Sequence, residues 1–220
     1  MKAMILAAGR GERLRPLTDS IPKPLVKINK KPLIQYHIEN LARIGVQDIV
    51  INIAWLGDKI IQTLGSGEQW GVRLHYSHED TALETGGGIK YALPLLGDDP
   101  FLVINGDIFI DKLPCIPVLE KNQLAYIWLV DNPEHNVKGD FCLFHNMVSG
   151  AENNKLTFAG IGLYCPSLFL QCERVRFPLG PLLKANMEQG AIFGEHMKTY
   201  WCDVGTIERL NRLEKKLIDK

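Results

Sequence analysis

Short runs of aliphatic residues alternate, over the first 130 positions, with segments in which apolar residues recur every three or four positions. A short apolar run that stops at Gly, Asp or Asn indicates a buried strand, whereas the wider spacing indicates an amphipathic helix. The apolar runs predict strands over residues 3–8, 48–54, 72–77, 101–105 and 124–130. The spaced segments predict helices over residues 32–44, 57–64, 88–96 and 112–122. Strands that alternate with helices are typical of an α/β sandwich with a mostly parallel central sheet.

The chain from residue 131 onward is less regular. Residues 131–160 are polar and predict a loop that contains a hairpin over 141–149, and two further strands are predicted over 158–164 and 198–202. Thr206 can cap a closing helix whose buried face holds Ile207, Leu210, Leu213 and Leu217. These strands add a small antiparallel part to the sheet. Because no repeat or linker interrupts residues 1–220, we expect a single domain.

The overall charge of the chain is balanced, with 25 Lys and Arg against 25 Asp and Glu among 220 residues. No global field therefore attracts nucleic acid or a membrane surface, and any phosphate chemistry must depend on local cations. The five cysteines lack the CxxC spacing of a zinc site and are odd in number, which favours free thiols in a reducing compartment. No apolar run is long enough for a signal peptide or a membrane span, so we expect a cytoplasmic protein.

A long loop rich in Gly, Pro and charge, residues 9–31, follows the first predicted strand. Small residues in such a position allow backbone N–H groups to approach phosphate oxygens closely. A Walker A motif is excluded because no Lys-Ser or Lys-Thr follows the glycines, and a dinucleotide fingerprint is excluded because position 14 is Leu. Arg13 and Lys23 are the candidate phosphate-binding cations, and Lys23 lies between two prolines that restrict the local backbone.

The segment GxGxRLxPLTxxxPKPL, residues 9–25, resembles the signature of the sugar nucleotidyltransferase superfamily. Three further elements of that superfamily follow in order: ETGGG at 84–88, NGD at 105–107 and WCDVGT at 201–206. The resemblance implies a three-layer, Rossmann-like α/β/α sandwich with a nucleotide-binding half over about 1–110 and a sugar-binding half over about 111–220. It also implies transfer of a nucleoside monophosphate from an NTP to a sugar 1-phosphate, with release of pyrophosphate.

Asp107 and Asp203 each follow a predicted strand, so their carboxylates are expected at the carboxyl edge of the sheet, where open α/β sheets bind ligands. A lone Asp in such a position is often a turn former or a helix cap. The resemblance implies that these two residues are Mg²⁺ ligands, which suits an ion that takes one or two carboxylates together with substrate phosphates. It further implies Arg13, Lys23 and Asp107 as the catalytic residues. The expected nucleotide contacts are Ala8, Gly9, Gly11, Glu12, Arg13, Lys23, Glu79, Thr85 and Gly86.

Glu79 and the Thr85-Gly86-Gly87 turn resemble the elements with which the superfamily contacts the base, although a carboxylate also suits the donors of guanine. The expected contacts to the sugar phosphate are Asn105, Asp140 and Asn154. Within the superfamily, the chain most resembles the compact uridylyltransferases that act on N-acetylmuramic acid 1-phosphate in cell-wall recycling. The expected partners are therefore UTP and a sugar 1-phosphate, with no nucleic acid or membrane, and the protein is expected to be a monomer or small homo-oligomer.

Three other functions remain open from the sequence. The nearest is a mannose- or glucose-1-phosphate nucleotidyltransferase with a different base. A non-catalytic nucleotide-sugar sensor is disfavoured because Arg13, Lys23, Asp107 and Asp203 are all retained. An NAD-binding oxidoreductase is disfavoured by Leu14, where its fingerprint requires Gly.

Overall fold

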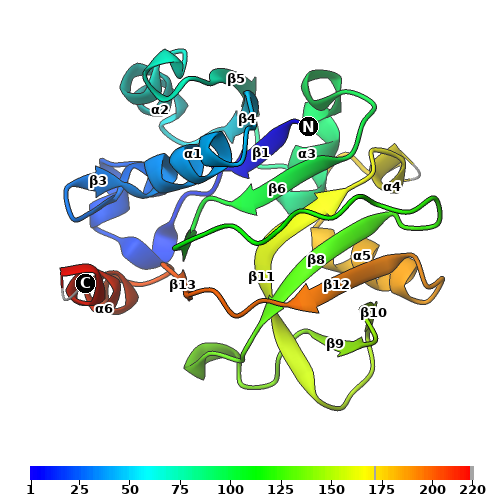
Figure 1. Cartoon of the computed structure of the whole chain (residues 1–220). Coiled ribbons are helices and arrows are strands. Elements are labelled where there is room, and N and C mark those ends of the chain that lie inside the picture. The colour runs from blue at the N-terminus through cyan, green and yellow to red at the C-terminus, as the bar shows by residue number, and fades with distance from the viewer. Residues whose placement is uncertain (171, 219–220) are drawn as a thin grey trace.

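The computed structural model describes residues 1–170 and 172–218, and its centre is a nine-stranded mixed sheet in the order β5-β4-β1-β6-β11-β8-β12-β10-β9 (Figure 1). Strands β5, β4, β1 and β6 run parallel to one another, β12 runs parallel to β8, and the other pairs in the sheet are antiparallel. The strands in this sheet are β1 Ala3–Leu6, β4 Asp48–Ile53, β5 Arg73–His78, β6 Phe101–Asn105, β8 Ala125–Val130, β9 Phe141–Phe144, β10 Met147–Ser149, β11 Lys155–Tyr164 and β12 Ile192–His196. Two small antiparallel ladders complete the strands: β2 Lys27–Ile28 with β3 Lys31–Pro32, and β7 Ile108–Ile110 with β13 Trp201–Asp203.

Helices cover both faces of the sheet and form three layers with it (Figure 1). Helices α1 (Leu33–Arg43) and α2 (Gly57–Leu64) lie on one face, and α3 (Glu84–Leu96), α4 (Ser167–Leu170) and α5 (Leu179–Met187) lie on the other. The closing helix α6 (Ile207–Ile218) packs beside β2 and β13. The α/β sandwich that the sequence predicts is therefore confirmed.

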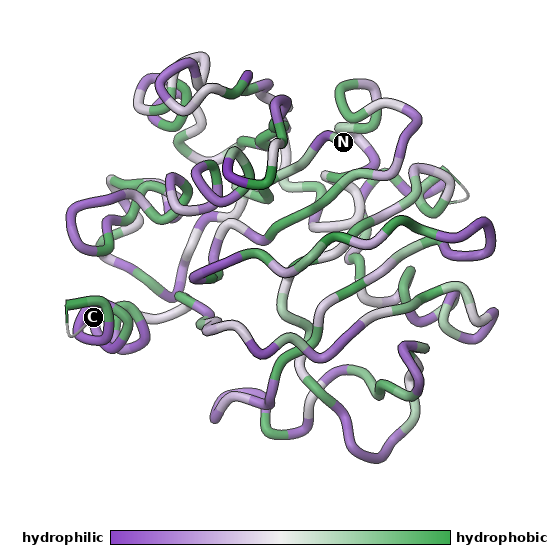
Figure 2. The backbone as a smooth tube through the Cα atoms, viewed as in Figure 1, coloured by the Kyte–Doolittle hydropathy of each residue, from purple (hydrophilic) through white to green (hydrophobic). Residues whose placement is uncertain are grey.

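Side chains that alternate along the central strands separate the core into two layers. In β1, Ile5 belongs to the layer under α1 and α2, whereas the adjacent Met4 packs under α3. Successive strand residues point to opposite faces, so a strand covered on both sides must be apolar throughout. The central strands in Figure 2 are accordingly mostly hydrophobic, whereas the edge strand β5, RLHYSH, is largely polar.

The antiparallel part of the sheet is larger than the sequence indicates, because strands β8 to β12 form most of the second half. Strand β9 pairs with both β10 and β11, so it connects the far edge of the sheet back to its middle. A register shift between Phe158 and Gly162 interrupts the pairing of β11 with β8. The predicted hairpin over 141–149 is present as β9 and β10.

Several predicted elements differ from the structure. The helix predicted over 112–122 is wrong, because Pro114 and Pro117 each remove a backbone donor and the segment has no regular structure. Helix α3 begins at Glu84, four residues earlier than predicted, and α5 and β12 were not predicted. Thr206 does cap α6, since its Oγ1 accepts a hydrogen bond from the Arg209 N–H at 3.3 Å, but Ile207 is exposed rather than buried.

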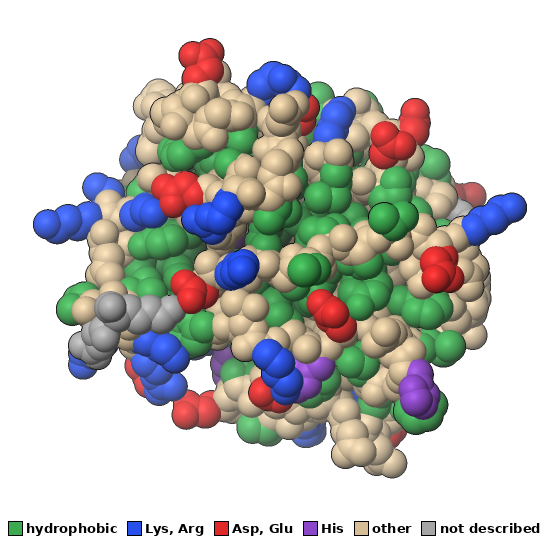
Figure 3. All heavy atoms as spheres, in the orientation of Figure 1, with side chains coloured by type: hydrophobic (Ala, Val, Ile, Leu, Met, Phe, Trp, Pro, Cys, Tyr) green, Lys and Arg blue, Asp and Glu red, His purple; other side chains and the backbone are tan. Residues whose placement is uncertain are grey.

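The surface carries charges of both signs. Basic and acidic side chains are interspersed over the face shown in Figure 3. The longest helix in the described ranges, α3, has 13 residues, and within those ranges no helix combines the length and apolarity that a bilayer crossing requires.

Candidate functional site

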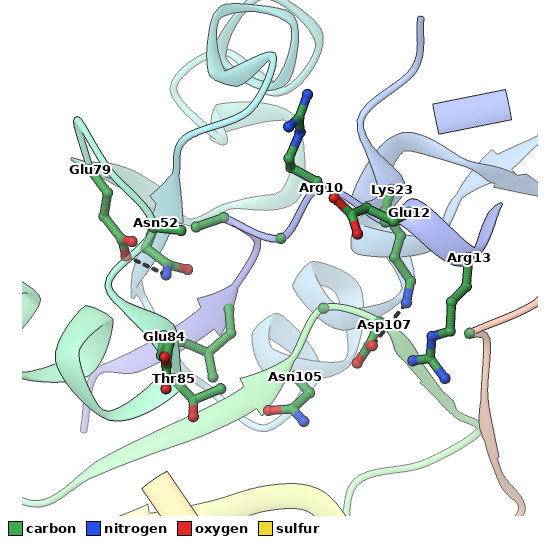
Figure 4. A pocket seen from close by; sticks show the side chains of 17 residues that line it. Arg10, Glu12, Arg13, Lys23, Asn52, Glu79, Glu84, Thr85, Asn105 and Asp107 are labelled. Atoms are coloured by element: carbon green, nitrogen blue, oxygen red, sulfur yellow. Dashed lines mark hydrogen bonds and ion pairs between the residues drawn. The ribbon is translucent and has the colours of Figure 1, made fainter. Parts of the chain in front are cut away.

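A cavity of about 690 Å³ opens at the carboxyl ends of β1, β4 and β6 and beside the segment that follows β5. In open α/β sheets this edge is where ligands bind. Most of the residues proposed from the sequence line the cavity, namely Ala8, Gly9, Gly11, Glu12, Arg13, Lys23, Glu79, Thr85, Asn105 and Asp107. Figure 4 shows that Glu79 lies at one side of the cavity, whereas Lys23, Arg13 and Asp107 lie at the other.

The glycine-rich loop is held in a compact turn against Lys23. Gly11 has a φ of +65°, in the left-handed region, and a Cβ at this position would lie 3.0 Å from both Lys23 Cβ and Thr18 Cγ2. Thr18 Oγ1 donates a hydrogen bond of 2.8 Å to the Gly11 carbonyl. Only Gly fits this combination of conformation and close approach. The loop can therefore bring its backbone N–H groups near the Lys23 ammonium.

Lys23 and Asp107 form an ion pair at the floor of the cavity. Lys23 Nζ lies 2.8 Å from Asp107 Oδ2, and only 8% of Lys23 is exposed. Lys23 is in a short 3₁₀ turn, Lys23–Leu25, which begins after Pro22, and Asp107 follows β6. A buried cation at the cavity floor attracts an incoming anion, because a low local dielectric constant strengthens its field.

Asp203 ends β13 and lies beside Asp107 in the backbone ladder. The Val204 N–H donates to the Asp107 carbonyl at 2.8 Å, and Asp203 is in register with Ile108. Arg209 Nη1 lies 2.9 Å from Asp203 Oδ1, but not in hydrogen-bonding geometry, so this buried oxygen has no hydrogen-bond partner among the described residues. A Cβ on Gly205 would lie 2.6 Å from Asp203 Oδ1 and 3.1 Å from Arg13 Nη2. Arg13 and Asp203 therefore lie close together beside Gly205, which lines the cavity, whereas Asp203 itself does not line it.

This pair of carboxylates suits a divalent cation that is shared with a ligand. No group of three or more His, Cys, Asp and Glu side chains is arranged for a metal within residues 1–170 and 172–218. Two carboxylates fit Mg²⁺ better, since that ion commonly takes one or two protein carboxylates and completes its shell with phosphates and water. Asp203 Oδ1 would have to exchange its ion pair with Arg209 for such an ion.

Two groups behind the site have pKa values shifted by burial. Burial lowers the pKa of His37, which lies under this end of the sheet in α1, to about 4; the Ile108 backbone and the Asp107 charge oppose this shift without cancelling it. Burial and then the Asp203 charge raise the pKa of the Cys202 thiol. His37 is therefore neutral at pH 7, and Cys202 remains protonated there.

Four other residues proposed from the sequence have varied surroundings. Asn105 lines the cavity and packs against Gly160 of β11, whose Cβ would lie 2.7 Å from Asn105 Nδ2. Gly86 does not line the cavity but packs under Phe177. Asp140 accepts hydrogen bonds from the Phe158 N–H at 2.8 Å and from Asn136 Nδ2 at 3.1 Å, which fixes the loop before β9. Asn154 is exposed in the turn before β11, with a φ of +54°.

The structure adds lining residues that sequence reasoning missed: Leu6, Arg10, Asn52, Ala82, Glu84, Gly106 and Gly205. Asn52 gave a usable signal, because it is a polar residue inside the aliphatic run DIVINIA. Such a residue in a buried strand needs a hydrogen-bond partner, and its partner is often part of a site. Arg10 gave no comparable signal; its guanidinium lies 4.3 Å from the centre of the Trp55 ring.

Comparison with known proteins gives a consistent set of relatives. Residues 2–125 match the family model described as nucleotidyl transferase. N-acetylmuramate alpha-1-phosphate uridylyltransferase of Neisseria meningitidis serogroup B is 46% identical over 224 residues, which cover 97% of each chain. The catalytic subunit beta of mannose-1-phosphate guanylyltransferase from Danio rerio is 29% identical over 93% of this chain, and the alignment spans 61% of that protein.

Among solved structures, one similar fold is that of a Bacillus anthracis protein provisionally assigned as a glucose-1-phosphate thymidylyltransferase and crystallised with sucrose. Its TM-score is 0.85, and the match covers 100% of this chain and 96% of the other. At 21% sequence identity, this likeness supports the fold alone.

Proposed function

The chain belongs to the nucleotidyl transferase family, and on that premise we propose that it transfers a uridylyl group from UTP to a sugar 1-phosphate and releases pyrophosphate. N-acetylmuramic acid 1-phosphate is the proposed acceptor, because the relative named for that activity aligns with almost the whole chain. The single observation that supports the proposal is that Lys23, Asp107 and Arg13 line one end of the cavity, with Asp203 close to Arg13 beside Gly205.

In the proposed reaction, an oxygen of the sugar 1-phosphate attacks the α-phosphorus of UTP, and the bond to the departing pyrophosphate breaks. A phosphate monoester is largely ionised at pH 7 because its second pKa is about 6. The protein therefore need not supply a general base. The main barrier is the approach of two anions, and positioned charges and N–H groups lower it.

We assign the cations of the cavity to the phosphates by their positions. Lys23, held at the floor, would bridge the attacking phosphate and the α-phosphate. Arg13 and the backbone amides of Gly9 and Gly11 would bind the β- and γ-phosphates and stabilise the leaving group.

Asp107 and Asp203 are the residues that we propose to hold Mg²⁺. When bound there, the ion would withdraw charge from the α-phosphate and help to align the reactants. The position of Asp107 at the cavity supports this assignment, as does the buried Oδ1 of Asp203, which accepts no hydrogen bond within the described residues and is ion-paired with Arg209.

The opposite end of the cavity, at Glu79 and Thr85, is the proposed base site, in the half of the chain over about 1–110. The proposed sugar side is the half over about 111–220, with Asp140 and Asn154 as sugar-phosphate contacts, and Asn105 at the end of β6 is the third proposed contact. Because Asp140 already accepts two hydrogen bonds within the protein, a direct contact from it to the sugar would use its remaining acceptor capacity.

A magnesium-dependent pyrophosphate-release assay tests the proposal. UTP, CTP, GTP and dTTP are each combined with the 1-phosphates of N-acetylmuramic acid, N-acetylglucosamine, glucose and mannose. We expect the highest kcat/KM with UTP and N-acetylmuramic acid 1-phosphate. A preference for GTP with mannose 1-phosphate would contradict it in favour of the guanylyl transfer for which other relatives are named. Nucleotide binding without any pyrophosphate release would instead indicate a sensor.

We further propose that the reaction occurs in the cytoplasm and serves peptidoglycan recycling. A cell that lacks the protein should then accumulate N-acetylmuramic acid 1-phosphate. Unchanged levels of this compound after gene deletion would contradict the proposal.

A further inference from the structure

Asn52 is a buried side-chain amide at the base end of the cavity. It is 3% exposed and lies in β4, among aliphatic residues. A buried amide must find hydrogen-bond partners for both its oxygen and its nitrogen, or its desolvation is uncompensated.

The backbone directly after β1 fixes the orientation of this amide. Asn52 Oδ1 lies 2.7 Å from the backbone nitrogen of Ala7, which can only donate. The atom that faces Ala7 must therefore be the oxygen, so Asn52 Nδ2 necessarily points the other way. It donates to Glu79 Oε1 at 2.7 Å.

Glu79 is held from two sides by donors. It is 3% exposed, and while Oε1 accepts from Asn52, Oε2 accepts from the Leu83 N–H at 3.0 Å. An ionised carboxylate satisfies both donors because each of its oxygens is an acceptor. A Gln at this position would present its NH₂ group to one of the two donors. Asn52 cannot flip its amide to compensate without losing the hydrogen bond from the Ala7 N–H.

Helix α3 leaves the pair no room to move away. A Cβ on Gly88 would lie 2.6 Å from Glu79 Oε1 and 2.9 Å from Asn52 Nδ2. The helix backbone therefore packs directly against the pair, and Asn52 and Glu79 both line the cavity (Figure 4). Four segments thus fix the direction in which the free lone pairs of Glu79 point.

We propose that Asn52 is a positioning residue that sets base selectivity, by holding the Glu79 carboxyl oxygens as acceptors toward the base. This inference rests on the proposed function. Uracil presents an N3–H donor, whereas cytosine has an unprotonated N3 acceptor at the same place. A fixed carboxylate therefore binds the first and repels the second. UTP and CTP share ribose, triphosphate and ring size. The selectivity ratio, defined as the affinity for UTP divided by the affinity for CTP (Kd of CTP over Kd of UTP), therefore isolates this interaction.

The test measures Kd for UTP and CTP, with magnesium, on the full chain by calorimetry, alongside kcat/KM for each. Asn52→Asp keeps an acceptor for the Ala7 N–H but places a second carboxylate oxygen against Glu79. Glu79→Gln places its NH₂ group against either the Asn52 amide donor or the Leu83 N–H donor. Each variant is expected to lower the selectivity ratio for UTP over CTP about tenfold or more, which is the effect of losing one hydrogen bond to a charged group. The Asn52→Asp change is expected to raise the Kd of UTP and leave kcat at saturation within about threefold.

The double variant Asn52→Asp with Glu79→Gln restores the donor and acceptor sequence from Ala7 to Leu83. It is expected to regain more of the ratio than either single variant has. Ser77→Ala is the matched control, because Ser77 is buried beside Asn52 in the adjacent strand β5. It is expected to leave the ratio unchanged.

Two results would overturn the inference. One is a folded Asn52→Asp variant with the ratio of the unmodified protein. The other, which applies even if Asn52→Asp does not fold alone, is a double variant no better than Glu79→Gln. Failure of the proposed function gives a different result, because the unmodified protein would then release no pyrophosphate with any sugar 1-phosphate. The Kd values for UTP and CTP would still test the role of Asn52.

Discussion

Lys23 Nζ lies 2.8 Å from Asp107 Oδ2, so a cation proposed to bind phosphate and a carboxylate proposed to bind metal are paired before any ligand enters. Asp107 is the more exposed partner, with 36% of its side chain accessible against 10% for Lys23. Mutual neutralisation lowers the cost of keeping both charges at a half-buried position. To bind a phosphate or a metal ion at the shared atoms, Lys23 and Asp107 would exchange their ion pair for a contact to the ligand.

Lys23→Met should lower the kcat of pyrophosphate release by about two to three orders of magnitude, the cost of losing one positioned charge at a transition state. Because Asp107 remains partly exposed, the fold should persist. Lys27→Met is the control, since Lys27 is exposed in β2 and should leave kcat within about twofold. Steady-state kinetics checks both. A Lys23→Met enzyme with the kcat of the unmodified protein would exclude Lys23 from the reaction.

Asp107→Asn and Asp203→Asn should each weaken metal binding by about tenfold or more, because each replaces an anionic oxygen ligand of a hard cation. Titration with Mn²⁺, followed by electron paramagnetic resonance of the free ion, measures this directly. EDTA should abolish turnover of the unmodified protein, and added Mg²⁺ should restore it. Asp99→Asn, at the opposite edge of the sheet, should change neither property. Unchanged Mn²⁺ affinity in both site variants would eliminate the carboxylate pair as the metal site.

The same substitution in two helices should have unequal effects on stability. Gly88→Ala in α3 places a Cβ 2.6 Å from Glu79 Oε1 and should destabilise the fold by about 1–3 kcal/mol, the usual cost of overpacking. Gly180→Ala in α5 has no atom within 4 Å of its Cβ apart from those of its chain neighbours, but Pro181 follows it and disfavours a helical residue that carries a Cβ, so the gain in helix propensity is offset and stability should change by less than about 0.5 kcal/mol. Urea unfolding measures both. Equal effects would show that the contact between α3 and Glu79 is not tight.

The first half of the fold was predictable because its central strands β1, β4 and β6 are buried almost throughout and α1 and α2 each have a regular apolar face. The position of β6 matches its predicted range, residues 101–105, because Gly106-Asp107 ends it abruptly. The second half was harder to predict. Its strands range from three residues in β10 to ten in β11, and the pairing that defines β12 is with β8, which lies far earlier in the chain. The false helix over 112–122 came from giving too little weight to two prolines.

The site was predictable where its residues lie close together in the sequence, as in the glycine-rich loop and Lys23. The link from Ala7 through Asn52 to Glu79 joins three strand ends that are far apart in the chain, so no local pattern contains it. The polar residue in an aliphatic strand indicated that Asn52 has a partner but not which one. Side-chain orientation is determined by tertiary packing, which a single sequence does not specify.

His37 offers a further test, of the core behind the site. It is fully buried in α1, and neither ring nitrogen has a hydrogen-bond partner within the described residues. Burial without a partner disfavours the imidazolium, because a charged ring loses its hydration there. This is why the pKa of His37 falls from 6.5 to about 4.

This shift predicts how stability depends on pH. Between pH 6.5 and about 4 the unfolded chain binds a proton at His37 that the folded chain does not, so stability rises with pH across that window. The contribution of His37 should therefore fall by about 3 kcal/mol from pH 7 to pH 4, at up to about 1.4 kcal/mol per pH unit. His37→Leu removes this proton uptake, so urea unfolding should show the variant losing less stability than the unmodified protein as the pH falls. His78→Gln, which changes an exposed histidine, should keep the original slope. Parallel pH profiles for His37→Leu and the unmodified protein would mean that His37 is protonated inside the fold.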